Sequence, residues 1–233
     1  MKRIFVPTRD GADWQRHLAK PKLHWKSGAS AMTAAASWEA AADRLPPEIA
    51  ALLSQTSQPE LSDLHLLVAI PEWQVELPGG QTRSATDVLA LCRNTSGLCT
   101  IAVEAKVLED FGPTVGEKRA GASPGQAERL DFLCELLGVS QFSDRTRYQL
   151  LHRTASALLT ARDFHASTAV MLVQAFDTPA DRMQDFERFA AQLRASPVSP
   201  GVLRVEHSQS PRLYLAWCSG DASFRKSNLP SAV

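Results

Sequence analysis

The sequence predicts an α/β protein, with a mixed central sheet that contains a three-strand antiparallel meander and is flanked by helices. Three observations predict this class. Helical segments precede and follow a block of strand-like sequence, two short turns interrupt that block, and a later segment of ten residues, 167–176, is almost continuously apolar. Because 44% of the 233 residues are hydrophobic, the chain can form a sizeable core.

The N-terminal part mixes basic and aromatic residues without clear periodicity. Residues 1–30 carry seven Lys or Arg and two Asp, a balance of +5. We expect residues 1–29 to form a basic arm and residues 30–233 to form a single domain. Helices are expected over 30–45 and over 46–55, where two prolines suit the first turn, and a third short helix over 64–70, ended by Pro71.

The period then changes to two. Residues 72–77 alternate between apolar and polar, the glycine-containing segment 78–81 predicts a turn, and 86–93 predicts a second strand. A turn at 94–97 leads to a third strand over 98–107, which is rich in β-branched residues. Three strands joined by two short turns predict the antiparallel meander.

The second half alternates helices and strands. A loop of 18 residues, 108–125, is long enough to suggest a functional or mobile segment. Helices are expected over 126–138, from about 144 to 163, and from Asp181 onward. The apolar segment 167–176 is typical of a strand buried on both faces, and two further strands are expected at 201–208 and 212–219.

Glu104 and Lys106 are the charged residues of the third strand. Residues two apart in a strand face the same way, and the turn at 94–97 would bring Asp87 alongside on the second strand. Two adjacent carboxylates raise each other's pKa, and a divalent cation with oxygen ligands removes that penalty. A lysine beside the cation can hold a water or a phosphate oxygen, as metal-assisted phosphodiester hydrolysis requires. The alternative is a solvent-facing Glu–Lys pair on an edge strand, with Asp87 in a turn.

Asp87 followed by Glu104, Ala105 and Lys106 resembles the PD-(D/E)xK nuclease superfamily, in an uncharacterised bacterial branch. The order of elements matches that superfamily from about residue 30 to 177, with one departure: Thr86 rather than proline precedes Asp87. The resemblance implies a restriction-endonuclease-like core. It implies that Asp87 and Glu104, with the carbonyl of Ala105, ligate Mg²⁺ or Mn²⁺, and that Lys106 positions the attacking water.

The same resemblance implies further site residues. An extra acid often comes from the first strand or the preceding helix; Glu72 is favoured for this metal-ligating role over Glu76, Glu39 and Glu48. Substrate-binding side chains are expected on the helices after the third strand, at Gln126, Arg129, Gln149 and Arg153.

The expected function is therefore a metal-dependent nuclease acting on DNA, in bacterial defence or repair. The alternative is a catalytically inactive binding or assembly module with the same fold. The formal net charge is zero, which counts against tight non-specific DNA binding. We expect the basic arm, the 107–124 loop or homodimerisation to supply the missing contacts.

The expected location is the cytoplasm, with no membrane partner. No segment approaches the roughly 18 apolar residues of a membrane span. The N-terminal apolar segment is too short for a signal peptide, and the four cysteines lack the C-x-x-C spacing of zinc sites, which suggests reduced core thiols.

Overall fold

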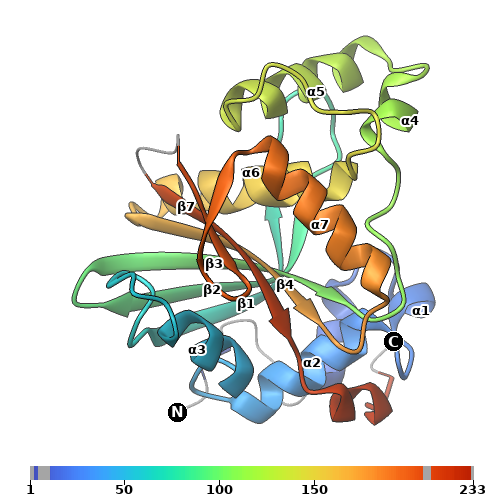
Figure 1. Cartoon of the computed structure of the whole chain (residues 1–233). Coiled ribbons are helices and arrows are strands. Elements are labelled where there is room, and N and C mark those ends of the chain that lie inside the picture. Colours follow the sequence, from blue (N-terminus) through green and yellow to red (C-terminus); the bar gives the residue numbers. More distant parts are fainter. Residues whose placement is uncertain (1–2, 5–10, 207–210, 232–233) are drawn as a thin grey trace.

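A seven-stranded mixed β-sheet lies at the centre of the protein, whose computed structural model describes residues 3–4, 11–206 and 211–231 (Figure 1). The strand order is β1-β2-β3-β4-β7-β6-β5. The strands are β1 (His65–Val75), β2 (Ser84–Asn94), β3 (Gly97–Lys106), β4 (Thr168–Ala175), β5 (Ala195–Ser199), β6 (Val202–Val205) and β7 (Arg212–Ser219).

Both pairing modes occur in this sheet. β1, β2 and β3 are consecutive antiparallel neighbours, β3, β4 and β7 are parallel, and β6 and β5 continue antiparallel to β7. Every residue of β4 is buried, because helices cover this central strand on both faces. The sheet therefore confirms the α/β class and the mixed character expected from the sequence.

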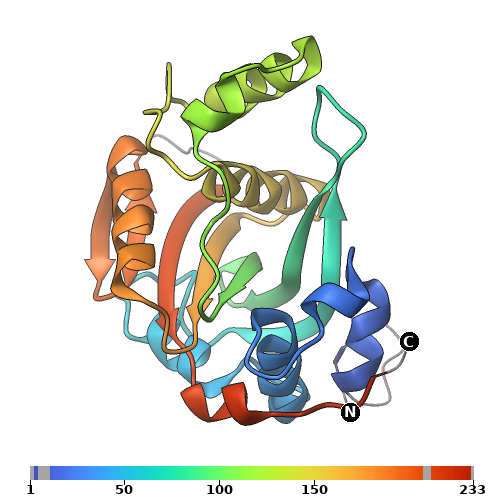
Figure 2. The same ribbon diagram turned by 90° about the vertical axis from the view of Figure 1, so that its right-hand side faces the viewer.

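Helices form one layer on each face of the sheet (Figures 1 and 2). One layer holds α5 (Pro124–Leu136), α6 (Tyr148–Asp163) and α7 (Ala180–Gln192), whose apolar residues share a core with β4 and β7. The other holds η1 (Gly11–His17), α1 (Pro21–His24), α2 (Ser30–Ala41) and α3 (Pro47–Ser54). Residues of η1, α2 and α3 share a second core with the opposite face. The short α4 (Val115–Arg119) precedes α5, and η2 (Ala222–Lys226) follows β7.

The helix expected over 64–70 is wrong, because these residues lead into and form the first half of β1. Their backbone pairs with β2, from His65 opposite Arg93 to Ile70 opposite Leu89. Pro71 does not end the element; β1 is an edge strand, where a residue without an N–H is tolerated. Five short elements were also not expected: η1, α1, β5, η2, and α4 within the 108–125 loop.

The N-terminal segment packs against α2. Trp14 and Trp25 are 4% and 8% exposed and belong to the core beneath α2 and α3. Part of the expected basic arm, residues 1–2 and 5–10, lies outside the described residues, so the boundary at residue 30 stays a prediction. Among the described helices, none combines the length and the apolar character that crossing a bilayer demands.

Candidate functional site

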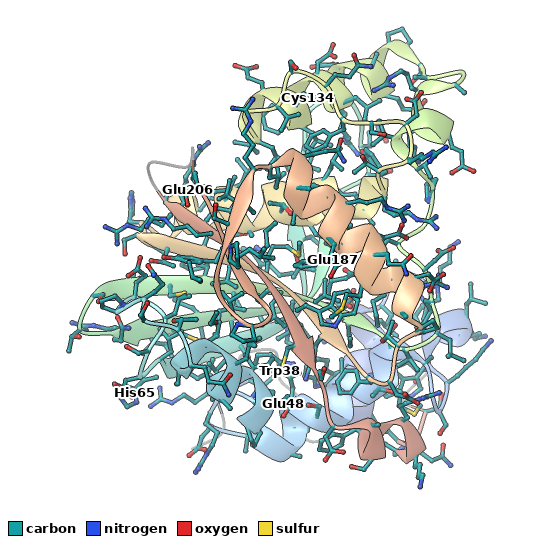
Figure 3. All side chains as sticks on the ribbon, in the orientation of Figure 1. Trp38, Glu48, His65, Cys134, Glu187 and Glu206 are labelled. Carbon is teal, nitrogen blue, oxygen red and sulfur yellow. The ribbon has the colours of Figure 1, made fainter. Side chains whose placement is uncertain are left out.

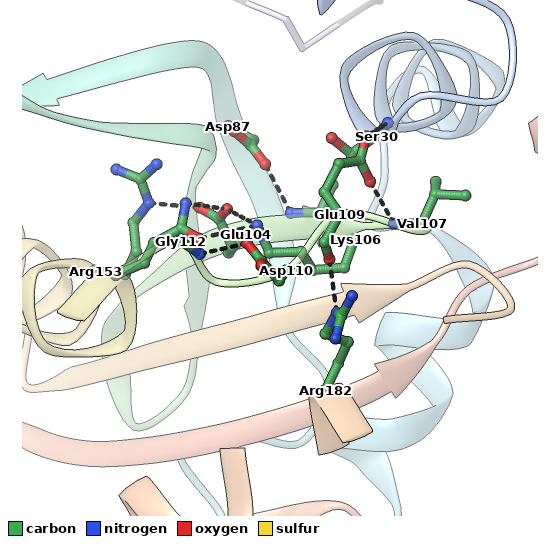
Figure 4. Close-up of polar contacts among 12 residues, drawn as sticks. Ser30, Asp87, Glu104, Lys106, Val107, Glu109, Asp110, Gly112, Arg153 and Arg182 are labelled. Atoms are coloured by element: carbon green, nitrogen blue, oxygen red, sulfur yellow. Dashed lines mark hydrogen bonds and ion pairs between the residues drawn. The ribbon is translucent and has the colours of Figure 1, made fainter. Parts of the chain in front are cut away.

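The strands β2 and β3 separate at one end. Their register runs from Asn94 opposite Gly97 to Val88 opposite Val103, and stops there. Beyond that point the Asp87 carboxylate accepts a hydrogen bond from the backbone N–H of Ala105, with Oδ2 2.7 Å from the nitrogen (Figure 4). The Asp87 side chain thus replaces the backbone hydrogen bond that regular pairing of β2 with β3 would supply at Ala105. Because the N–H and C=O of one strand residue project to the same edge, the Ala105 carbonyl faces the same gap.

Glu72 on β1 lies opposite Asp87. Its neighbours Pro71 and Trp73 pair with Val88 and Thr86, but pairing is interrupted between them. Glu72 has φ +52°, an uncommon left-handed conformation for a residue with a side chain. Since Val88 in turn pairs with Val103, the register aligns three carboxylic acids across three neighbouring strands: Glu72, Asp87 and Glu104.

Near the loop that joins them, β1 and β2 turn toward α6 the face that further along the strands packs against α2 and α3. Val88 belongs to the core beneath α2 and α3, whereas Val75 belongs to the core beneath α6. Ser84, paired with Val75, lies 2.8 Å from Nδ1 of His152 on α6. Regular strand alternation would have kept both ends of β2 on one side; on β1, the left-handed residue Glu72 lies where the face changes.

Glu104 is the centre of a buried hydrogen-bond network. It is 3% exposed and Lys106 is 4% exposed. Oε1 of Glu104 accepts from Nζ of Lys106 at 2.7 Å and from Nε2 of Gln149 at 2.6 Å, and Oε2 accepts from Nε of Arg153 (Figure 4). Gln149 and Arg153 are four residues apart on α6, so both side chains lie on the helix face that covers β3.

The three acids differ in their electrostatic environment. Burial, together with the Asp87 charge, raises the pKa of Glu72 to about 9. Burial and the Glu104 charge raise the pKa of Asp87 to about 7. Burial acts in the same direction on Glu104, but the charges of Arg153 and Lys106 outweigh it and lower its pKa to about 2. Of these three acids, Glu104 is therefore ionised at neutral pH, Asp87 is partly protonated and Glu72 holds a proton.

Of the four expected substrate-binding residues, Gln149 and Arg153 contact Glu104, and the other two have structural partners. Gln126 accepts from the backbone N–H of Ser123 in the capping box that starts α5. Arg129 donates to four backbone carbonyls of the loop between β1 and β2, those of Leu77, Pro78, Gly80 and Thr82. The other candidates for the extra acid lie elsewhere: Glu39 accepts from Trp14, Glu48 contacts Gln174, and Glu76 pairs with Arg83.

Ser84 belongs to the site but was not expected from the sequence. Its hydroxyl also accepts from Nη1 of Arg153 at 3.2 Å, which links the β1–β2 ribbon to α6. A serine at a strand start carries no sequence signal for this role. His152 lies four residues after Tyr148, and their rings are 5.1 Å apart; that helical spacing is visible in the sequence.

Asp87, Glu104 and Ala105 supply oxygen atoms, the ligand type that a hard divalent cation prefers. The Asp87 carboxylate and the Ala105 carbonyl face the gap between β2 and β3, whereas the Glu104 carboxylate faces α6. Mg²⁺ is often bound through one or two protein carboxylates plus water. Binding of a cation by Glu104 requires one of its oxygens to contact the cation while it still accepts a hydrogen bond from Lys106, Gln149 or Arg153. Within the described residues, no group of three or more His, Cys, Asp or Glu side chains is arranged to hold a metal ion.

Comparisons with known proteins place the chain in a family. No curated protein and no solved structure matches it. A family model described as a domain of unknown function (DUF6946) matches residues 7–222, which include the acidic row, α6 and the segments around them. Since the match covers most of the chain, this protein belongs to the DUF6946 family.

Proposed function

We propose that the protein is a Mg²⁺-dependent phosphodiester hydrolase of the nuclease type that acts on DNA, in bacterial defence or repair. The observation that carries the proposal is the row of Glu72, Asp87 and Glu104, with Lys106 beside it, at the point where β2 and β3 separate. In this proposal β1, β2 and β3 are the meander of a restriction-endonuclease-like core, with α6 covering the site.

Each side chain of the site has its own role in this proposal. Asp87, Glu104 and the Ala105 carbonyl would hold Mg²⁺ or Mn²⁺, with Glu72 next to Asp87. When bound, the cation supplies positive charge that stabilises the negative charge developing on phosphate oxygens. Lys106 is held 2.7 Å from Glu104 and 3.0 Å from Gln149, so its ammonium is fixed where it can orient a water or a phosphate oxygen. Arg153 fixes the other oxygen of Glu104.

The raised pKa of Asp87 and Glu72 supports a cation between these strands. Both shifts come from burial and from neighbouring negative charge, which is the penalty that a divalent cation removes. Cation binding should therefore release protons and tighten as pH rises through 7, because Asp87 must ionise to become a ligand.

The test is cleavage of a mixed panel of double-stranded DNA, single-stranded DNA and RNA, with Mg²⁺, with Mn²⁺ and with EDTA. We expect metal-dependent cleavage of DNA, reduced on the order of 10²-fold or more in Lys106→Ala and Glu104→Gln. Arg162→Ala is the matched control, since Arg162 is exposed at the opposite end of α6. Circular dichroism verifies that each variant folds. Cleavage by Lys106→Ala at the wild-type rate would rule out the proposed mechanism.

The competing proposal is a catalytically inactive module that uses the same fold for binding or assembly. One observation favours it: both oxygens of Glu104 already accept hydrogen bonds from Lys106, Gln149 and Arg153. The two proposals differ in the wild-type protein. DNA retention without cleavage in either metal supports the binding module. Sedimentation at several protein concentrations tests the homodimer that we propose as its assembly.

A further inference from the structure

A pocket of about 720 Å³ opens beside Lys106. Its walls come from segments far apart in the sequence: the loop between β1 and β2, residues 110–113, α4, and the first turns of α5 and α6. Lys106, Gln149 and Arg153, which contact Glu104, also line it. The pocket therefore adjoins the acidic row without including its carboxylates.

The pocket lining is strongly cationic. Among the described lining residues, five are basic and one, Asp110, is acidic; the basic residues are Arg83, Lys106, Lys118, Arg129 and Arg153. Lys106 and Arg153 share the charge of Glu104, and Arg83 pairs with Glu76. In the part of the chain that the structure describes, neither Lys118 nor Arg129 forms an ion pair with a carboxylate. The excess positive charge favours an anionic ligand.

Two helix N-termini add to this potential. Ser123 and Gln126 at the start of α5 line the pocket, as do Tyr148 and Gln149 at the start of α6. The helix dipole gives each N-terminus a partial positive charge. The basic side chains and the two helix N-termini therefore all contribute positive charge to the pocket.

An aromatic surface lies within this cationic lining. The Tyr148 ring is half-buried, 5.1 Å from the His152 ring and 5.3 Å from Nζ of Lys118. Burial and the charge of Arg153 hold the pKa of His152 well below its usual value, so its ring is neutral. An aromatic ring next to an ammonium is the pair that binds a base and its phosphate in single-stranded nucleic-acid sites.

One wall of the pocket is held firmly in place. Arg129 joins α5 to the β1–β2 loop through its four carbonyl contacts. Gly79 and Gly125 touch directly behind it: a Cβ on Gly79 would lie 2.0 Å from the Gly125 carbonyl oxygen. Figure 2 shows the tip of this ribbon rising toward α5, above α6. The pocket volume falls in the range of sites for small ligands, so it suits about one nucleotide and is too small for a duplex.

We propose that this pocket binds one unpaired nucleotide, with its phosphate against Lys118 and its base on the Tyr148 ring. The nucleotide is either free or one unit of a single strand. Binding of the nucleotide does not depend on the proposed function. Only the further statement, that a DNA strand reaches Lys106 and Glu104 in unpaired form, rests on that function.

The experiment measures binding in EDTA, so that hydrolysis plays no part. The probe is a fluorescent single-stranded DNA oligonucleotide, followed by anisotropy, with three competitors: the same strand unlabelled, its blunt duplex, and adenosine monophosphate. We expect competition by the unlabelled strand and little by the duplex. Competition by the monophosphate identifies a free nucleotide as a sufficient ligand, whereas competition by the strand alone assigns the pocket to nucleic acid.

The variants test the two named contacts. Tyr148→Leu should weaken binding about tenfold through lost stacking, and Lys118→Ala should weaken it several-fold and reduce its salt dependence. Lys118→Arg, which keeps the charge, and Arg162→Ala, at the far end of α6, should bind like the wild type. Equal competition by duplex and single strand, or unchanged binding by both Tyr148→Leu and Lys118→Ala, overturns the inference.

The outcome is separable from that of the proposed function. Strand binding that depends on Tyr148 and Lys118, without cleavage in Mg²⁺, retains the pocket and rejects the hydrolase. Metal-dependent cleavage that neither pocket variant alters, with binding also unaltered, retains the hydrolase and rejects the pocket.

Discussion

Two buried polar clusters lie on opposite faces of the sheet at nearly the same level. Glu104 faces α6, and Gln174, which pairs with its neighbour Ala105, faces α2 and α3. The Gln174 side chain accepts from Nε1 of Trp38 at 3.1 Å and donates to Ser37 and Glu48. Trp38 lies on α2 and Glu48 on α3, and both are labelled in Figure 3. It is a largely neutral network of hydrogen bonds around a fully buried amide.

The difference lies in charge and access. The Glu104 cluster combines three acids with two cations, and two of those acids have a raised pKa. Lys106, Gln149 and Arg153 also border a pocket, whereas no residue of the Gln174 cluster lines that pocket. Burial of polar groups alone therefore does not identify a functional site. Unrelieved charge next to an accessible volume marks a candidate functional site.

Glu104→Ala should produce the largest loss of stability. It leaves Lys106 and Arg153 buried beside an empty space, and removal of one partner from a buried charge cluster costs about 3–5 kcal/mol. Urea denaturation at pH 7 measures the loss. Glu104→Gln, which keeps the shape and one acceptor oxygen, should cost less. Equal losses for the two variants would show that the charge of Glu104 accounts for the whole contribution and that the space its side chain fills adds nothing.

Gln174→Leu should rank second. The indole N–H of Trp38 and the hydroxyl of Ser37 would lose a partner, at a cost of about 2–3 kcal/mol in the free energy of unfolding. Because the cluster is separate from the pocket, cleavage and strand binding per folded molecule should stay at the wild-type level. A changed binding constant in this variant would contradict the distinction between the two clusters.

Asp87→Asn should affect stability in a pH-dependent manner. The folded pKa of about 7 lies above the ordinary value of about 3.9, so the wild type is not penalised near pH 4 and loses stability as pH rises to 7. Since Asp87 is partly exposed, we expect the variant to gain about 1–2 kcal/mol over the wild type at pH 8 in EDTA, and little at pH 4. Mg²⁺ should stabilise only the wild type.

The stability contribution of Glu104 changes with pH in the opposite direction to that of Asp87. Its folded pKa of about 2 lies below the ordinary value of about 4.3, so its contribution is present above pH 4.3 and is lost as pH falls through 2. Denaturation curves between pH 3 and pH 9 in EDTA should therefore show greatest stability from this cluster near pH 4–5. A stability that rises steadily from pH 5 to pH 9 would contradict the cited shifts.

Arg83→Ala should have the smallest effect on stability. Arg83 and Glu76 form an ion pair on the same β1–β2 ribbon, but both side chains are more than half exposed. Exposed pairs contribute about 0–1 kcal/mol, and we expect a change below about 0.5 kcal/mol at physiological salt. This variant provides the baseline for a charge pair outside the core; a loss comparable to that of Gln174→Leu would mean that Arg83 has a further structural partner.

The local part of the site could be predicted from the sequence, and the tertiary part could not. Strand alternation places Glu104 and Lys106 on one face, and a two-residue turn brings β2 alongside β3. The left-handed conformation of Glu72 has no sequence signal, because glutamate does not favour it. The carbonyl contacts of Arg129 arise only once α5 lies against the β1–β2 loop.

The error over 64–70 has a related cause. A short apolar segment fits both a buried helix and a buried strand, and only its partner decides between them. Here the partner is β2, which pairs with β1 along most of its length. The match between expected and observed elements is accordingly better for long segments with a clear period, such as α7 and β7, than for short ones such as β5.

The contact between Gly79 and Gly125 has a consequence for the order of assembly. It joins backbone from the β1–β2 loop to the start of α5 without any intervening side chain. A molecule in which α5 has not yet docked can possess a finished sheet and still lack one side of the cavity. Occupancy of the cavity and attachment of this helix are thus thermodynamically linked: whatever fills the cavity also fastens α5 to the ribbon.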